Sequence, residues 1–309
     1  GTAPWRPTAR ESNMRLTTCE YQQQQYLGVV IDTTVALPAL AGPWPKTMLE
    51  LIDGGPSQWA RLEKRLHQMP SKARVPLEEV KLLAPIPRPR KNIMCLGLNY
   101  ADHASEALEA RDQAIKLPDH PVVFTKAPTS VNGPFSDIPF DTRVSTKIDW
   151  EVELGLVIGK KGRGIPVATA LQHVFGYTVI NDISARDIQS RHQQFFLGKS
   201  LDGACPMGPW IVTVDEISDP QDLDLRCWVN GILKQDSNTR HQIFSVATAI
   251  AILSHGTTLE PGDIVATGTP AGVGYARTPP EFLTPGDVVE CEVGKIGRLR
   301  NSIVEINYR

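Results

Sequence analysis

Short apolar runs of strand length, separated by glycine and proline, dominate the chain from Ile93 onward. They predict strands at residues 93–98, 121–126, 153–159, 175–182, 210–214, 225–231, 263–268 and 287–293. Only two segments of this part, 166–173 and 244–255, have the apolar spacing of helices. Many short strands with few helices indicate a mainly β body, so we expect an α+β chain.

The residues before Ile93 follow a different pattern. Residues 14–40 alternate as strands do, whereas residues 46–70 carry apolar side chains at helical spacing, interrupted by Gly-Gly-Pro at 54–56. The stretch 82–92 is rich in proline and charge and marks a boundary. We therefore predict a small N-terminal α+β domain at 14–84 and a larger domain at 85–309. Residues 1–13 are expected to be a flexible leader or a remnant of cloning.

Composition excludes several classes of partner. The 309 residues are 41% hydrophobic with a formal net charge of −2. They include no basic stripe for nucleic acid and no polybasic segment for an anionic membrane. No apolar run reaches the roughly eighteen residues that a membrane span needs. The five cysteines are scattered and form no C-x-x-C pair, which indicates reduced core thiols and a cytoplasmic location.

The segment DWEVELGLVIGK (149–160) places Asp149, Glu151 and Glu153 at alternate positions of a predicted strand. Such side chains share one face, with neighbours roughly 7 Å apart, so their charges repel unless a cation or protons neutralise them. The apolar continuation of the segment directs it into the interior, where an isolated charge is costly. A hard divalent cation is the simplest resolution.

A further carboxylate, Asp182, follows the apolar run 177–180. With Glu151 and Glu153 it makes a set of three oxygen donors, which suits Mg²⁺ or Mn²⁺, whereas zinc prefers His or Cys. The alternative is that Glu151 and Glu153 face solvent on an edge strand. The acidic turn after a second apolar strand favours the metal site.

Two other segments carry candidate chemistry. In INDISARDIQ (180–189), Arg186 either neutralises a substrate carboxylate or pairs within the protein, and Asp187 is best explained by a structural salt link. In LNYADHASEAL (98–108), His103 and Glu106 are neighbours on one helical turn. A carboxylate that orients an imidazole is a common general-base arrangement, but a surface helix with a chance His and Glu has the same pattern.

Two lysines and one glycine-rich turn complete the candidates. Lys126 ends the predicted strand 121–126, and Lys199 lies among apolar residues and glycines. Each either extends to water or, beside a dicarboxylic substrate, binds carboxylate or stabilises an enolate. The turn TGTPAGVG (267–274) is no phosphate loop, because Pro270 lacks an N–H group. Its other N–H groups and the Thr269 hydroxyl suit an anion.

Taken together, the motifs GLNYADH, DWEVELGLVIGK, NDISARDIQ, GKSLDG, PMGPW, VNG and GTPAGVG resemble the fumarylacetoacetate hydrolase family from about Asn92 to Ile306. The resemblance implies a mixed β-sheet roll, a homodimer and a Mg²⁺ or Mn²⁺ cofactor. It assigns the metal to Glu151, Glu153 and Asp182; catalysis to His103, Glu106 and Lys199; and substrate binding to Arg186, Gln189, Lys126 and Thr269. Leu201 and Ala204 stand where the family usually has aromatic residues, and this changes which shape of substrate we expect the site to accept.

The resemblance also implies an activity. We expect a hydrolase that cleaves a C–C bond in an acylpyruvate or related β-diketo acid, by way of an enolate held by the metal, with His103 activating water. The same site supports oxaloacetate decarboxylation, enol–keto conversion or isomerisation of a 2-hydroxy-dienoate. The His103–Glu106 pair favours hydrolysis, since decarboxylation needs no activated water. A non-catalytic binding protein is the third hypothesis, and the intact set of site residues argues against it.

Overall fold

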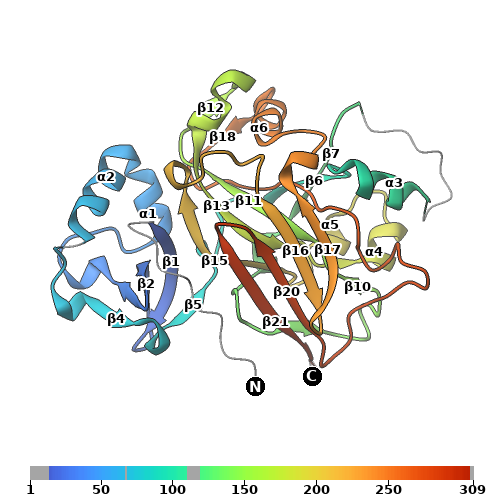
Figure 1. Ribbon diagram of the computed structural model, residues 1–309, viewed down its shortest axis with the longest axis horizontal. Coiled ribbons are helices and arrows are strands. Elements are labelled where there is room, and N and C mark those ends of the chain that lie inside the picture. The colour runs from blue at the N-terminus through green and yellow to red at the C-terminus, as the bar shows by residue number, and fades with distance from the viewer. Residues whose placement is uncertain (1–13, 67, 110–118, 307–309) are drawn as a thin grey trace.

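Two β-sheets packed against each other, with a smaller lobe at one side, form the computed structural model (Figure 1). The structure describes residues 14–66, 68–109 and 119–306, so the predicted leader at 1–13 lies outside the described residues. This strand-rich α+β architecture confirms the predicted fold class. In the described ranges, none of the helices has the length and apolarity needed to cross a membrane.

The larger sheet has twelve strands in the order β4-β3-β2-β1-β15-β13-β11-β19-β6-β7, with β5 beside β1 and β8 beside β15. Its strands are β1 (Arg15–Tyr21), β2 (Gln24–Ile31), β3 (Thr34–Ala36), β4 (Arg74–Pro76), β5 (Lys81–Leu83), β6 (Ile93–Gly97), β7 (Val122–Lys126), β8 (Val131–Asn132), β11 (Val152–Ile158), β13 (Val174–Asn181), β15 (Cys205–Thr213) and β19 (Ile264–Ala266).

The second sheet has five strands, in the order β17-β16-β20-β21-β9. They are β9 (Ile138–Phe140), β16 (Asp224–Val229), β17 (Ile232–Asn238), β20 (Val288–Val293) and β21 (Gly297–Glu305). Two short pairs complete the β structure: β10 (Ile148–Asp149) with β14 (Ser184–Ala185), and β12 (Gly162–Arg163) with β18 (Thr258–Leu259). Every strand predicted from Ile93 onward is present, with ends that differ by a few residues.

The helices are fewer and short. The α-helices are α1 (Met48–Asp53), α2 (Gly55–Leu66), α3 (Ala101–Glu109), α4 (Arg186–Arg191), α5 (Phe196–Lys199) and α6 (Val246–Ser254). The 3₁₀ helices are η1 (Pro38–Leu40), η2 (Ser71–Ala73), η3 (Leu77–Glu79), η4 (Pro128–Ser130), η5 (Val167–His173), η6 (Val214–Glu216) and η7 (Thr239–His241). The predicted break at 54–56 is confirmed, whereas the segment predicted as a helix at 166–173 is a 3₁₀ helix. Its β-branched Val167 and Thr169 have low α-helix propensity.

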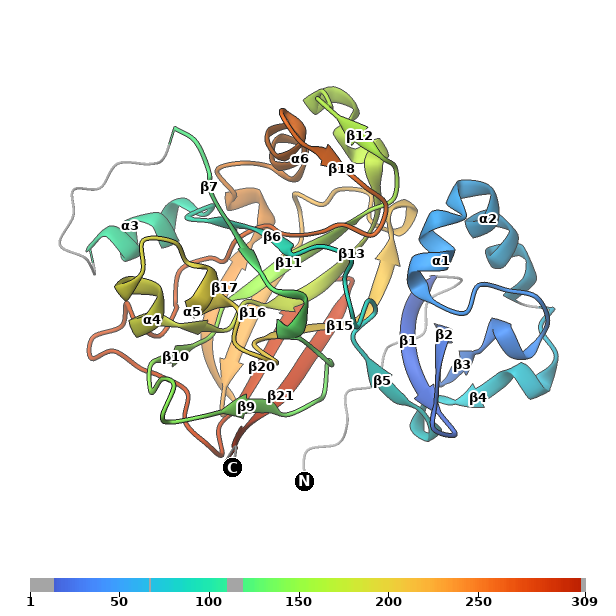
Figure 2. The ribbon, with the colours of Figure 1, turned by 180° about the vertical axis from the view of Figure 1, so that it is seen from behind.

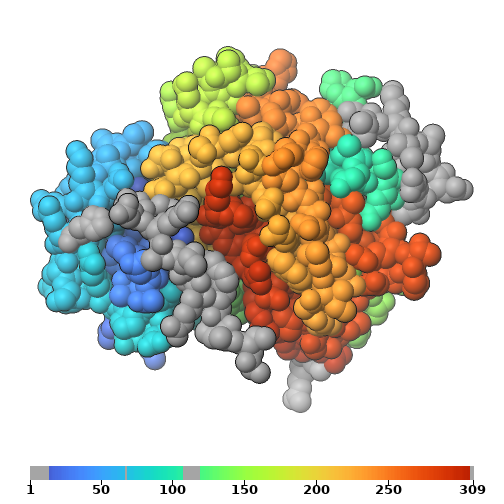
Figure 3. All heavy atoms as spheres, viewed as in Figure 1, coloured from blue at the N-terminus to red at the C-terminus, as the bar shows by residue number. Residues whose placement is uncertain are grey.

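The N-terminal lobe shares its sheet with the rest of the chain. Its strand β1 pairs with β15 through Arg15 opposite Val212 and Leu16 opposite Ile211. The Thr17 hydroxyl also donates to the Pro209 carbonyl oxygen at 3.1 Å. Figures 1 and 3 show the lobe, in blue, directly beside the body. The lobe predicted at 14–84 is therefore joined to the body by backbone pairing as well as by the linker.

Strand β11 positions the site. It lies inside the large sheet between β13 and β19, and all seven of its residues are buried. An edge position, the alternative considered for Glu151 and Glu153, is thus excluded. In the view from behind, α4 and α5 lie together near β10, on the side of the body that also carries α3, β6 and β7 (Figure 2).

Candidate active site

Antiparallel pairing of β11 with β13 brings three carboxylates together. Val152 pairs with Asn181, so Glu151, just before β11, lies beside Asp182, just after β13. The Asp182 N–H donates to the Glu151 carbonyl oxygen at 2.9 Å. One carboxylate oxygen each from Glu151, Glu153 and Asp182 lie within 4.8 Å of one another, and all three side chains are buried. We call these three residues the carboxylate cluster.

Asp149 does not belong to this cluster, contrary to the expected alternation from residue 149. Regular β11 begins only at Val152, and Asp149 lies in β10, which pairs with β14. Its carboxylate accepts from Arg186 Nε at 2.8 Å and from the backbone N–H groups of Gly274 and Tyr275 at 2.7 and 3.0 Å. Two residues between β10 and β11 lack strand geometry, and the period-two pattern fails there.

Two buried lysines neutralise part of the cluster. Lys199, the last residue of α5, has its Nζ 2.8 Å from both Glu151 Oε2 and Asp182 Oδ2. Lys126, the last residue of β7, donates to Asp182 Oδ1 at 2.7 Å and to the Ile183 carbonyl oxygen at 3.0 Å. Lys126 is completely buried and lies off the pocket wall, so it does not extend to water. Its contact with substrate remains a prediction.

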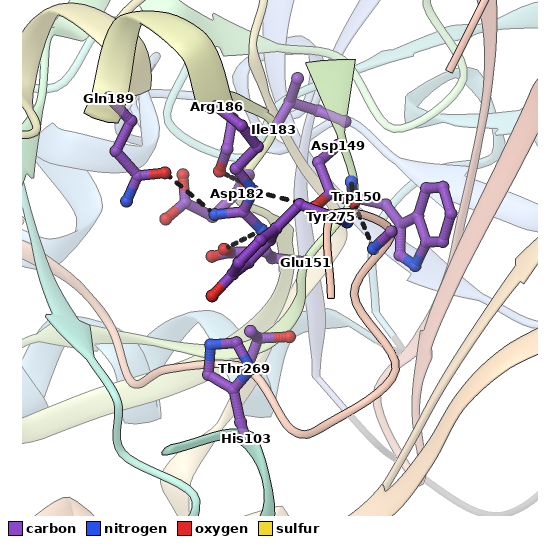
Figure 4. Close-up of polar contacts among 12 residues, drawn as sticks. His103, Asp149, Trp150, Glu151, Asp182, Ile183, Arg186, Gln189, Thr269 and Tyr275 are labelled. Carbon is purple, nitrogen blue, oxygen red and sulfur yellow. Dashed lines mark hydrogen bonds and ion pairs between the residues drawn. The ribbon is translucent and has the colours of Figure 1, made fainter. Parts of the chain in front are cut away.

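Arg186 opens α4 and pairs within the protein (Figure 4). Besides its bond to Asp149, it has Nη2 2.7 Å from Glu151 Oε1, and Nη1 donates to Gln189 Oε1 at 3.0 Å. Asp187 instead accepts hydrogen bonds from the Ser145 hydroxyl at 2.6 Å and the Ile188 N–H at 2.9 Å, so its contacts are structural, but among the described residues they are hydrogen bonds and not the salt link that we expected. The guanidinium therefore links the cluster to Gln189 and Asp149.

The electrostatics of the cluster call for an added cation. Burial alone would raise the pKa of Glu151, but the positive charges of Lys199 and Arg186 outweigh it and lower that pKa. Burial raises the pKa of Glu153 well above its usual value, and the negative charges of Asp182 and Glu151 raise it further. In the described part of the chain, Glu153 accepts one hydrogen bond, from the Gly268 N–H at 2.7 Å. Three buried hard oxygen donors, of which Glu153 has no ion pair among the described residues, fit a divalent cation such as Mg²⁺ or Mn²⁺.

Helix α3 carries the His–Glu pair. His103 Nδ1 lies 3.4 Å from Glu106 Oε2, and the side chain of His103 is 7% exposed. Both Glu106 oxygens also lie 3.1 Å from the N–H of Gly272, which anchors the carboxylate to the glycine-rich turn. A chance pair on a surface helix would be exposed and unanchored, so the structure favours the functional alternative.

The glycine-rich turn binds anions, and these are the protein's own carboxylates. Its N–H groups donate to Glu153 from Gly268, to Glu106 from Gly272, and to Asp149 from Gly274. The Thr269 hydroxyl donates to the Val152 carbonyl oxygen at 2.9 Å and accepts from Gln235. One turn thus fixes a member of the cluster, the partner of His103 and the partner of Arg186.

A pocket opens above the cluster. Six of the predicted site residues line it: His103, Glu151, Arg186, Gln189, Lys199 and Thr269. Glu106, Glu153, Asp182 and Lys126 lie behind these residues, in contact with them or with the cluster. The structure thus brings all ten predicted residues into one region.

The aromatic walls of the pocket were missed from the sequence. Phe124, Phe195 and Tyr275 also line it. The Phe124 ring centroid lies 4.8 Å from Lys199 Nζ, and the Phe124 ring packs edge-on against the ring of Phe195. Phe124 stands two residues before Lys126, and Tyr275 directly follows the turn TGTPAGVG. Their closeness in sequence to Lys126 and to the turn TGTPAGVG was the one feature that could have identified them, because single aromatic residues form no periodic pattern.

Comparison with known proteins agrees with this geometry. The family model described as fumarylacetoacetate (FAA) hydrolase C-terminal matches residues 92–304. The oxaloacetate tautomerase YisK of Bacillus subtilis is 42% identical over 94% of this chain and 100% of its own length. The mitochondrial oxaloacetate tautomerase Fahd2a of Rattus norvegicus is 42% identical over 90% of this chain and 84% of its own.

A solved structure gives the same result. The fumarylacetoacetate hydrolase of Exiguobacterium antarcticum is 38% identical, covers 95% of this chain and 100% of its own, and superposes with a TM-score of 0.81. The matched regions include the strands and turns that build the pocket, and so the chain belongs to the fumarylacetoacetate hydrolase family.

Proposed function

We propose that this chain is a metal-dependent enzyme that interconverts the enol and keto forms of a short dicarboxylic keto acid, with oxaloacetate as the first substrate to test. The observation that carries the proposal is the buried carboxylate cluster, flanked by Lys199 and Arg186 in a pocket that His103 also lines. Two relatives named as oxaloacetate tautomerases match 94% and 90% of the chain.

The pocket is suited to an anion despite its carboxylates. Lys199 uses two of its three N–H donors on Glu151 and Asp182, which leaves one for a substrate oxygen. Gln189 and Thr269 add polar groups to the wall. Because these side chains are buried and held by one another, they keep their orientation when a substrate enters.

The chemistry needs one proton removed from the enol oxygen and one added to the other carbon of the C=C bond, next to the carbon that bears the oxygen. His103 lines the pocket and is oriented by Glu106, so it is the candidate to carry that proton. Glu151, Glu153 and Asp182 would hold the divalent cation, which when bound supplies Lewis-acid stabilisation of negative charge on the enolate. Phe124 and Phe195 limit access of water to Lys199.

Hydrolysis of a C–C bond in an acylpyruvate is the second candidate. The His103–Glu106 pair favours it, because an oriented imidazole on a pocket wall can also deprotonate a water molecule. One similar solved structure is named a fumarylacetoacetate hydrolase. Two relatives named as tautomerases match at higher identity, 42% against 38%, which supports testing enol–keto conversion first.

Kinetics with two substrate classes tests the proposal. Enol oxaloacetate is added to the protein with Mg²⁺ or Mn²⁺, and the loss of enol absorbance is followed against a chelator control. We expect acceleration over buffer that the chelator abolishes and that His103→Ala lowers by about 10²–10⁴-fold. The exposed His255→Ala is the matched control and should keep full activity. Cleavage of acylpyruvates without enol acceleration would instead support hydrolysis, and neither activity would refute both.

Two further expectations from the family resemblance remain proposals. We propose a homodimer, which sedimentation analysis of the purified chain would test. We also propose a cytoplasmic location; one relative is named as mitochondrial, and imaging or fractionation in the source cell would distinguish the two.

A further inference from the structure

Tyr275 lines the pocket and has no assigned role. Its ring centroid lies 4.4 Å from the Arg186 guanidinium carbon, which is the stacked geometry of a cation–π contact. In Figure 4 the ring lies in front of Glu151, with Arg186 above it in the view and His103 and Thr269 below it. The ring is thus a wall of the space that a bound acid would occupy.

Asp149 fixes the position of this ring in two ways, through the backbone of Tyr275 and through Arg186. The Tyr275 N–H donates to Asp149 Oδ2 at 3.0 Å, and the same carboxylate accepts from Arg186 Nε at 2.8 Å. Asp149 therefore holds the backbone of the tyrosine and also the cation on which its ring stacks. Asp149 is completely buried, so water does not compete for these bonds.

Gly274 tightens this arrangement. A Cβ atom at residue 274 would lie 2.1 Å from the Glu281 carbonyl oxygen and 2.8 Å from Asp149 Oδ1. Only glycine fits there, and its N–H donates to Asp149 Oδ1 at 2.7 Å. The backbone just before Tyr275 is therefore held in place by these contacts. Because the Tyr275 ring also stacks on Arg186, the side chain is held in the pocket at both its backbone and its ring.

We propose that Tyr275 determines substrate size: its ring, locked over Arg186 by Asp149, closes one wall of the pocket and excludes acids that carry a bulky group next to the reacting carbon. The inference rests on the proposed function and extends it to a substrate class, namely compact, unbranched keto acids. Shape complementarity to a rigid ring discriminates by steric overlap, so the preference is isolated when small and bulky acids of equal charge are compared.

The test compares Tyr275→Ala with Tyr275→Phe on a small and a bulky acid. The enols of oxaloacetate and phenylpyruvate undergo the same conversion, but phenylpyruvate has a phenyl ring where oxaloacetate has its second carboxylate. That difference in charge is the same for every variant, so a change in the ratio of kcat/KM between variants reports on the wall that the tyrosine ring forms. For Tyr275→Ala we expect the ratio of kcat/KM, phenylpyruvate over oxaloacetate, to rise at least about tenfold. Tyr275→Phe keeps the ring and should leave the ratio within about threefold of the unaltered protein. Tyr26→Ala removes a half-buried tyrosine of the N-terminal lobe and should change kcat/KM for neither substrate.

A binding measurement separates this inference from the proposed function. Calorimetry with Mg²⁺ gives the dissociation constants of malonate and phenylmalonate, two unreactive dicarboxylates that differ by one ring. In Tyr275→Ala we expect the affinity for phenylmalonate, relative to that for malonate, to rise about tenfold, even if the protein lacks tautomerase activity. An unchanged ratio in a variant that melts as a folded protein overturns the proposal. An equal shift in Tyr275→Phe also overturns it, because the hydroxyl and not the ring would be responsible. If Tyr275→Ala fails to fold, Tyr275→Leu replaces it.

Discussion

The ammonium group of Lys126 is a structural partner of Asp182. It is completely buried, and among the described residues it donates to Asp182 Oδ1 and to the Ile183 carbonyl oxygen. Lys126→Met leaves the Asp182 carboxylate with one cation in place of two, and we expect a loss of about 3–5 kcal/mol in the free energy of unfolding. Denaturant unfolding measures this loss.

The matched control for that measurement is Lys161→Met. Lys161 has a side chain that is 67% exposed and lies 3.5 Å from Glu260, so its removal should cost less than about 1 kcal/mol. Equal losses for the two variants would show that burial of the Lys126–Asp182 pair has no special weight.

The cysteine thiols are protected by burial. All five are free and buried, and burial raises the pKa of Cys19 and of Cys205 to about 12. A thiol with that pKa forms thiolate only as the pH approaches 12, so at pH 8 it holds roughly a thousandfold less thiolate than one titrating near 9.

Labelling with a thiol reagent at pH 8 tests this. The native protein should react at fewer than one site within minutes, whereas the unfolded chain should react at all five. Adding an exposed thiol with Ser57→Cys should give one fast equivalent and so confirm that the reagent is competent. Rapid reaction of several native thiols would contradict the buried positions.

Residue types, spacing and the family resemblance together named ten residues that the structure brings into one region, but they did not give the partners of these residues. Glu151 and Glu153 could be read from a local strand pattern, because β11 imposes its period on them. The partners of Asp149 are Arg186 and the 274–275 backbone, far away in the chain. Its contacts follow from the pairing of β10 with β14 and from the path of a loop, which no local pattern encodes.

At the scale of elements, the turn 267–274 organises the site. It supplies N–H donors to three carboxylates from three different elements, and a Cβ atom built at Gly272 or at Gly274 would lie 2.1 Å from a backbone carbonyl oxygen. Gly274→Ala places a Cβ 2.1 Å from the Glu281 carbonyl oxygen, so the backbone must move. We expect a loss of about 1–3 kcal/mol in stability. We also expect kcat/KM to fall, and by a larger fraction than the free energy of unfolding, since Asp149 and Arg186 move with the turn.

Gly256→Ala is the control for the turn. No atom lies within 4 Å of a Cβ built at that exposed glycine, so stability should change by less than about 0.5 kcal/mol. Thermal melts and kinetics on both variants decide the matter. Full activity in Gly274→Ala would show that the turn does not position the site.

Elements were predictable where the pattern was long and local. The strands from Ile93 onward and the break between α1 and α2 follow from apolar periodicity and glycine. The six-residue α4 and four-residue α5 are too short for a periodic signal, yet they carry Arg186, Gln189 and Lys199. Their helical geometry depends on packing against β14 and β7 and not on their own propensity.

At the scale of the whole molecule, one sheet runs through both lobes. The body and the N-terminal lobe are paired at β1 and β15, and the Thr18 hydroxyl donates across the boundary to the Pro85 carbonyl oxygen at 2.7 Å. The sequence placed a boundary at 82–92 because proline and charge mark a linker. It gave no sign of the pairing, since strand partners distant in the chain share no local pattern.

Metal binding should act on the stability of the whole chain, because the carboxylate cluster joins β11 to the end of β13. At a Mg²⁺ concentration of 100 times its Kd, binding to the folded state adds about 2.7 kcal/mol. We therefore expect the melting temperature to rise by several degrees with Mg²⁺ and to fall again with chelator.

Glu153→Gln should separate the charge of the cluster from its fold. The pKa of Glu153 is raised in the folded chain, so its ionisation costs stability as the pH rises above the usual value of 4.5, and the cost is absent below it. Glutamine has no charge to bury and can still accept from the Gly268 N–H. At pH 7 without metal, the variant should therefore be at least as stable as the unaltered protein, while its stabilisation by Mg²⁺ should disappear. Equal stabilisation of both proteins by Mg²⁺ in a thermal melt would show that Glu153 is not a ligand, whereas a less stable metal-free variant would show that its charge is already compensated within the fold.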